Sequence, residues 1–125
     1  MWEKFETEHP GDKLAQLHAW VRIAADMLRA DGRGCDMANA AVELSETDHP
    51  ARRVIKELKE AQRDRLVTLC RDAGIGQAEL LADTLSLLLE GARVSVQSVG
   101  TEGPSAQFVR MAEGLIVSFR GTAAG

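Results

Sequence analysis

The sequence contains no long apolar run, few aromatic residues and only two cysteines. Its purely apolar runs do not exceed three residues, as at 87–89, whereas a membrane-spanning helix needs about 20. The N-terminus lacks a basic segment followed by an apolar one, which excludes a typical signal peptide. Cys35 and Cys70 have no CxxC spacing, so they predict reduced thiols in a cytoplasmic protein; a disulfide between them is the alternative.

A surplus of positive charge is also missing. The net charge is −4, with 15 basic and 19 acidic residues among 125. The densest basic segment, 52–60, is interrupted by two glutamates. Binding to a phosphate backbone requires clustered Lys and Arg side chains. The chain by itself is therefore not expected to bind nucleic acid.

Apolar residues recur at spacings of three and four along most of the sequence, and no segment alternates as a strand does. Hydrophobic residues make up 45% of the chain and charged residues 27%, as in globular domains. Glycine and proline divide the sequence into helical segments. The pattern predicts an all-α helical bundle with one short helix at about 36–44 and four main helices at about 12–30, 50–73, 77–99 and 105–120.

The helix predicted at 77–99 has two apolar strips, and only the bulkier strip is needed to form a core with helices 12–30 and 50–73. The leaner strip, and the apolar face of the last helix, are left without a partner in one chain. We therefore expect a homodimer in which the last two helices of each subunit form an intersubunit four-helix bundle. In the alternative, the last helix packs on its own chain. The predicted interface consists of Leu87, Gly91, Val94, Ser98, Phe108, Ala112, Leu115 and Phe119.

Three motifs resemble those of TetR-family transcriptional regulators. Residues 33–44 (RGCDMANAAVEL) are similar to a family segment that reads RGC, two residues, then NAAxE. Residues 48–52 (DHPAR) match a second motif, and residues 87–92 (LLLEGA) resemble the centre of the dimerisation helix. The resemblance extends over most of the chain, from about Asp12 to Phe119.

The resemblance implies a two-part repressor, with an N-terminal helix-turn-helix head and a C-terminal domain that dimerises and senses an effector. Residues 1–11 would be a remnant of the connecting helix or linker, 12–120 the effector-binding and dimerisation domain, and 121–125 a flexible tail. No segment before Asp12 is long enough to form the head. Operator DNA would thus be bound only through a missing N-terminal domain, whether the sequence belongs to a longer protein or is a natural headless variant.

An effector pocket is expected inside each subunit, between helices 12–30, 50–73 and 77–99. Mostly apolar walls suit a small, largely apolar effector. For Trp20 and Met27 the alternative role is core packing, and Glu90 with Arg93 is interpreted as a surface or interface-rim pair, with a pocket role as the alternative. The predicted lining is Trp20, Ile23, Met27, Met37, Gln62, Leu66, Leu85 and Leu89.

Two Glu-x-x-His pairs, at 6–9 and 46–49, match part of the di-iron motif of helical bundles. Pro10 and Pro50 follow the two histidines directly, and a residue before proline is disfavoured in helical conformation. The pairs are therefore expected at chain turns. We predict no catalytic residue, metal or cofactor. A metal-binding enzyme is the weaker alternative, and a stand-alone helical dimerisation module without ligand or DNA binding is the stronger one.

Overall fold

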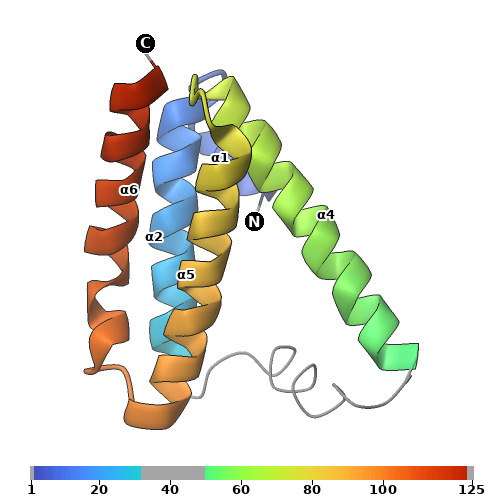
Figure 1. The fold of residues 1–125 in the computed structure, drawn as a ribbon, viewed down its shortest axis with the longest axis vertical. Coiled ribbons are helices and arrows are strands. Elements are labelled where there is room, and N and C mark those ends of the chain that lie inside the picture. The colour runs from blue at the N-terminus through green and yellow to red at the C-terminus, as the bar shows by residue number, and fades with distance from the viewer. Residues whose placement is uncertain (1, 32–49, 124–125) are drawn as a thin grey trace.

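The computed structural model describes residues 2–31 and 50–123, and within these ranges every regular element is a helix. This confirms the predicted all-helical fold, and each main helix begins and ends within three residues of its predicted bounds. The predicted helix at 36–44, with Met37, the motif at 33–44 and Cys35, lies outside the described residues. The elements are α1 Trp2–Glu8, α2 Lys13–Asp31, α4 Pro50–Asp72, α5 Ala78–Val99, the 3₁₀ turn η1 Pro104–Gln107 and α6 Phe108–Ala123 (Figure 1).

Local sequence signals set the ends of these helices. The Asp12 carboxylate accepts a hydrogen bond from the Ala15 amide at 3.0 Å and caps α2. Gly74, with φ of +90°, ends α4, and the Ile75 amide donates to the Cys70 carbonyl at 3.1 Å. This is the Schellman arrangement, in which a left-handed glycine satisfies the last carbonyls of a helix.

Helices α2, α5 and α6 lie side by side, whereas α4 leans away from them towards its Pro50 end (Figure 1). The C-terminal half of α4 packs against α5 and α2, and α6 packs against the same two helices on the other side. Leu17, Leu81 and Leu85 are completely buried where these helices meet. The core therefore holds one end of α4 and leaves the other end separated from α5.

The short N-terminal helix α1 is anchored to the core. Phe5 is completely buried, and Trp2 packs edge-on against it with ring centroids 5.5 Å apart. The Arg65 guanidinium of α4 lies 5.1 Å from the centre of the Trp2 ring. The Gln16 side-chain amide donates to the His9 carbonyl at 2.8 Å. Residues 2–8, within the segment expected to be a remnant of the connecting helix or linker, thus form a helix that contacts both α2 and α4.

The last helix differs from the expectation. Phe108 and Ala112, expected at a dimer interface, are 1% and 0% exposed because they pack into the core of their own chain with Ile116. The sequence pattern left the apolar face of α6 without a partner in its own chain. In the structure, most of this face packs against α2 and α5. A hydrogen bond between the His18 imidazole and the Glu113 carboxylate also ties α6 to α2. The helix continues to Ala123, past the predicted end at about residue 120.

None of the described helices combines the length and apolar character needed to cross a membrane. Cys70 is a free, fully buried thiol, as predicted for a reduced cysteine. Burial raises the pKa of the Cys70 thiol to about 12, because removal from water disfavours the thiolate.

We predict that Cys70 is chemically inert in the folded protein. In a Cys35→Ser variant, Ellman's reagent at pH 8 should react with Cys70 at least about a hundredfold more slowly than in urea-unfolded chain, because the thiolate is the reactive form. Absorbance of the released thiolate measures both rates. Equal rates with and without urea would contradict the burial of this side chain.

Candidate functional site

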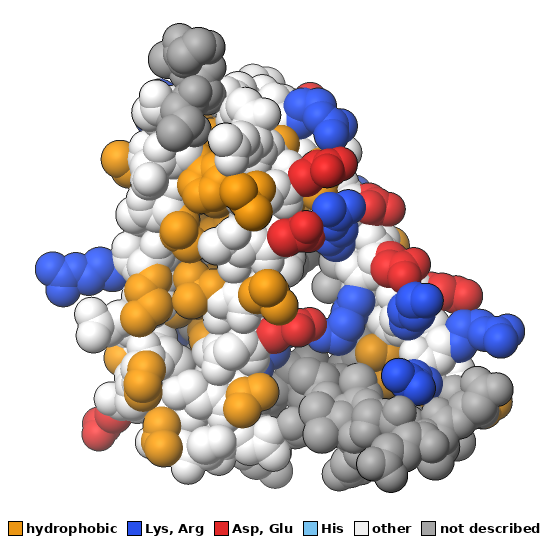
Figure 2. Space-filling model, viewed as in Figure 1, with side chains coloured by type: hydrophobic (Ala, Val, Ile, Leu, Met, Phe, Trp, Pro, Cys, Tyr) orange, Lys and Arg blue, Asp and Glu red, His pale blue; other side chains and the backbone are white. Residues whose placement is uncertain are grey.

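The divergence of α4 from α5 creates a cavity of about 1050 Å³, which we call the α4–α5 cavity. Figure 2 shows the surface hollowed between these helices, with charged side chains along the rim. Its walls come from α4 and α5, with α2 behind them and Trp2 of α1 at one end. Small-molecule sites typically measure roughly 300–1,000 Å³, so the cavity is large enough for a small organic molecule.

Sequence reasoning located much of the apolar wall of this cavity. Trp20, Met27, Gln62, Leu66 and Leu89 line it together, from three different helices. Ala24, Ile55 and Trp2 complete the apolar part, together with Leu87, which was predicted for the dimer interface. The structure therefore brings five of the eight predicted lining residues to one place.

Two of the other three predicted lining residues, Leu85 and Ile23, are not found in the cavity wall. Leu85 is completely buried in the core between helices, so its side chain is used in packing. Ile23 packs against the same core and does not reach the cavity. Met37 lies outside the described residues.

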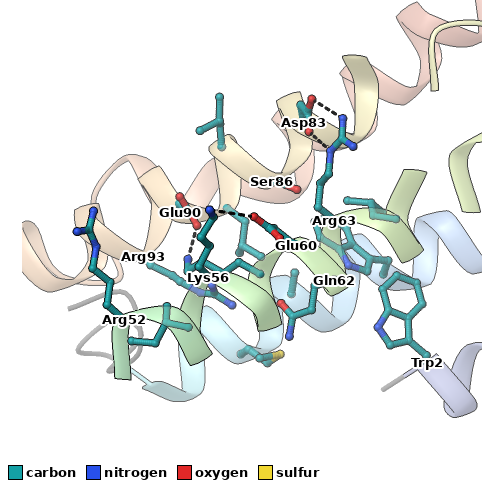
Figure 3. Close-up of a pocket in the computed structure, with 18 of the residues that line it drawn as sticks. Trp2, Arg52, Lys56, Glu60, Gln62, Arg63, Asp83, Ser86, Glu90 and Arg93 are labelled. Carbon is teal, nitrogen blue, oxygen red and sulfur yellow. Dashed lines mark hydrogen bonds and ion pairs between the residues drawn. The ribbon is translucent and has the colours of Figure 1, made fainter. Parts of the chain in front are cut away.

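A charged wall faces the apolar one, and sequence reasoning missed most of it. Asp83, Ser86, Glu90 and Arg93 form a strip along α5 that faces α4 across the cavity (Figure 3). Glu90 forms an ion pair with Lys59 of α4, not with Arg93 as its spacing predicted. The signal was present as a polar strip with spacings of three and four, but the sequence does not tell which polar strip faces another helix.

One charged contact closes the narrow end of the opening between α4 and α5. The Arg63 guanidinium donates two hydrogen bonds to Asp83, Nε to Oδ1 at 2.7 Å and Nη2 to Oδ2 at 3.0 Å (Figure 3). This bidentate arrangement favours the ionised carboxylate and lowers the pKa of Asp83. The same pair raises the pKa of Arg63. Arg63 and Asp83 thus link α4 to α5 where the two helices begin to separate.

A second surface of interest covers the exposed side of α5 and α6. Figure 2 shows apolar side chains running along this face. Leu87 and Val94 of α5 are 70% and 54% exposed, and Val117 of α6 is 65% exposed. Among the predicted interface residues, Gly91 and Ser98 are also exposed, while Leu115 and Phe119 are partly covered by the core. The predicted interface omitted the exposed Leu80, although it lies on the leaner strip of α5, and sequence reasoning missed the exposed Met111 and Val117 of α6.

Within residues 2–31 and 50–123, no three His, Cys, Asp or Glu side chains gather as metal ligands do. Of the first Glu-x-x-His pair, Glu6 is exposed on α1 and His9 follows the end of that helix. The second pair, at 46–49, lies outside the described residues.

We predict that the Arg63–Asp83 pair makes stability depend on pH in a defined direction. Because the pKa of Asp83 is lowered on folding, its contribution is complete above the ordinary aspartate pKa of about 3.9 and is lost as the pH falls through the folded value. Asp83→Asn should therefore lower the urea midpoint at pH 6, and the difference from wild type should shrink towards pH 3. Glu102→Gln, which removes a carboxylate without an ion-pair partner among the described residues, is the control. A difference that stays constant over this range would argue against the pair.

Neither a family model nor a curated protein matches the sequence. Among solved structures, the fold is similar to that of a TetR-family transcriptional regulator from Streptomyces coelicolor, with a TM-score of 0.82 and 23% sequence identity. The match covers 95% of this chain and 63% of that protein, so the chain spans less than two thirds of the regulator. The chain therefore has the TetR-like helical fold that its motifs indicated.

Proposed function

We propose that this chain is the effector-sensing and dimerisation domain of a TetR-type transcriptional repressor. The observation that carries the proposal is the α4–α5 cavity, which has an apolar wall, a charged wall and a size suited to a small molecule. Its position within a TetR-like fold supports the assignment. The proposed protein acts in the cytoplasm, and the proposal assigns it no catalytic role.

A homodimer is part of the proposal, with the exposed face of α5 and α6 as its interface. Gly91 and Gly114 lie in the middle of these helices, and a Cβ atom at either would meet no other atom within 4 Å. Glycine inside a helix costs about 1 kcal/mol relative to alanine, and no contact within the chain explains it here. Close approach of helices from a second copy would use both glycines and cover the exposed Val94 and Val117.

The proposed signal passes from the cavity to α1. An effector in the cavity would contact Trp2, which belongs to α1, and Trp20, which belongs to α2. A DNA-binding head N-terminal to α1 would read one half-site, and two heads must lie about 34 Å apart to engage successive half-sites. An effector that prefers another arrangement of α1 would lower operator affinity, by no more than its difference in affinity for the two arrangements.

The chain contains a built-in reporter for ligand binding, because its two tryptophans both line the cavity. We expect at least one member of a panel of small apolar molecules, including N-phenyl-1-naphthylamine, to change tryptophan fluorescence and raise the melting temperature. Ser86→Phe should weaken this binding about tenfold or more, because Ser86 lines the cavity and a phenyl group would fill part of it. Thr101→Phe, in the exposed turn before η1, is the matched control. No response to any molecule would leave a stand-alone dimerisation module as the better description.

The dimer can be tested separately from ligand binding. In sedimentation equilibrium at micromolar concentration, wild type should have twice the chain mass of 13.6 kDa. Val94→Glu should yield monomers, because a charge placed in a buried apolar interface is strongly unfavourable. Val54→Glu introduces the same charge at a 63% exposed valine of α4 and should remain dimeric. A wild-type mass of one chain would refute the dimer, and equal dissociation by both variants would refute this choice of interface.

A further inference from the structure

The wall of the α4–α5 cavity is positively charged although the whole chain is negatively charged. Six basic and three acidic side chains line the cavity, whereas the complete sequence has a net charge of −4. The excess lies beside an apolar surface that includes Trp20, Leu66 and Leu89. Such a combination suits a ligand with an apolar body and a negatively charged group.

All three acidic side chains of the cavity already have basic partners. Asp83 is held by Arg63 and Glu90 by Lys59, both across the cavity between α5 and α4. Glu60 lies 3.8 Å from Lys56 on the same helix. This leaves Arg52, Arg53 and Arg93 of the cavity wall without a carboxylate partner in the described part of the chain.

The order of these charges along the two helices indicates where an anion would bind. Going towards the N-terminus of α4, Arg63 faces Asp83, and one turn later Lys59 faces Glu90. Beyond these pairs, the cavity is lined by Arg52 and Lys56 on α4 and by Arg93 on α5. Near Arg63 and Lys59, basic side chains of α4 face acidic side chains of α5. Further along, basic side chains line both α4 and α5, and like charges brought together in a partly enclosed site repel each other.

We propose that the effector of this domain is an amphipathic anion, an apolar molecule with one acidic group, whose acidic group binds between Arg93 of α5 and Arg52 of α4. Figure 3 places both arginines towards one end of the cavity and Trp2 at the other, so the apolar body extends along the wall towards Trp2. Arginine is suited to this role because its planar guanidinium binds carboxylates and phosphates with two hydrogen bonds. The proposal rests on the sensing function proposed above and names the chemical class of its effector.

The test uses three probes that share a decyl chain and differ in charge: decanoate, decan-1-ol and decyltrimethylammonium. Tryptophan fluorescence reports their binding, since both tryptophans line the cavity. We expect decanoate to bind at least about fivefold more tightly than decan-1-ol at low ionic strength, from the worth of partly exposed ion pairs, and decyltrimethylammonium to bind most weakly. The advantage of decanoate should decrease with added salt, because salt screens exposed charges.

Variants locate the anion. Arg52→Gln with Arg93→Gln should reduce decanoate affinity to that of decan-1-ol and leave decan-1-ol binding unchanged. Arg52→Lys with Arg93→Lys keeps the charge and should retain most of the preference, which separates loss of charge from loss of folding. The matched control is Arg110→Gln with Arg120→Gln, two exposed arginines of α6 outside the cavity.

The outcomes separate the effector class from the sensing function. Equal binding of decanoate and decan-1-ol, tighter binding of the cationic probe, or the same loss in the α6 control would overturn the anionic effector while leaving a ligand-sensing cavity. If none of the three probes binds, the anionic effector is also overturned. If, in addition, no molecule of the wider apolar panel binds, the sensing function itself is overturned.

Discussion

Helix α5 presents three different surfaces at once, and the positions of the other helices follow from this. Leu81 and Leu85 are completely buried in the core. Asp83 and Glu90 contact α4 through Arg63 and Lys59. Val94 remains exposed, and Leu87, which also lines the cavity, is 70% exposed. Because successive residues of a helix are about 100° apart, a single 22-residue helix can serve a core, a cavity and an open apolar face.

The cavity exists because α4 is held in two different ways along its length. Its C-terminal half contributes Leu66, Leu69 and Cys70 to the core, and apolar packing brings it close to α5. Further towards Pro50, contact with α5 is made by long charged side chains, and Val54 is exposed. Long ion-pairing side chains keep two helix axes further apart than interdigitated leucines do. The change from apolar to charged contact along α4 therefore coincides with the opening of the cavity.

The change from apolar to charged contact along α4 also explains why the proposed site has both an apolar and a basic part. Asp83, Glu90 and Glu60 each pair with a basic side chain of α4. Among the described residues, the arginines further along the cavity therefore have no carboxylate partner, and we propose that they bind the acidic group of the effector. An apolar effector, as the sequence indicated, would use one wall only. An amphipathic anion would use both walls, and Trp2 of α1 lies at the end where its apolar body would reach. The proposed effector thus keeps the apolar body that the sequence predicted and adds one acidic group.

Helix bounds, the all-helical class and much of the apolar cavity wall could be predicted from the sequence, because spacing of three and four, Asp12, Gly74 and Pro50 act locally. The interface was predicted less well. Val117 lies next to Ile116 in α6, yet one is exposed and the other fully buried. A hydrophobic pattern tells which residues share a face, but it does not tell which neighbouring helix, or which other subunit, will cover that face.

By itself, the sequence determined where each main helix begins and ends to within three residues, and which residues are apolar on each side. Both depend on backbone hydrogen bonds and side-chain spacing within one segment. Only the tertiary structure decided that Phe108 and Ala112 pack inside their own chain. It also decided that Arg63 meets Asp83 and that Trp2 reaches the cavity. These contacts join residues from different helices, and their geometry depends on how the helices pack, which no local pattern specifies.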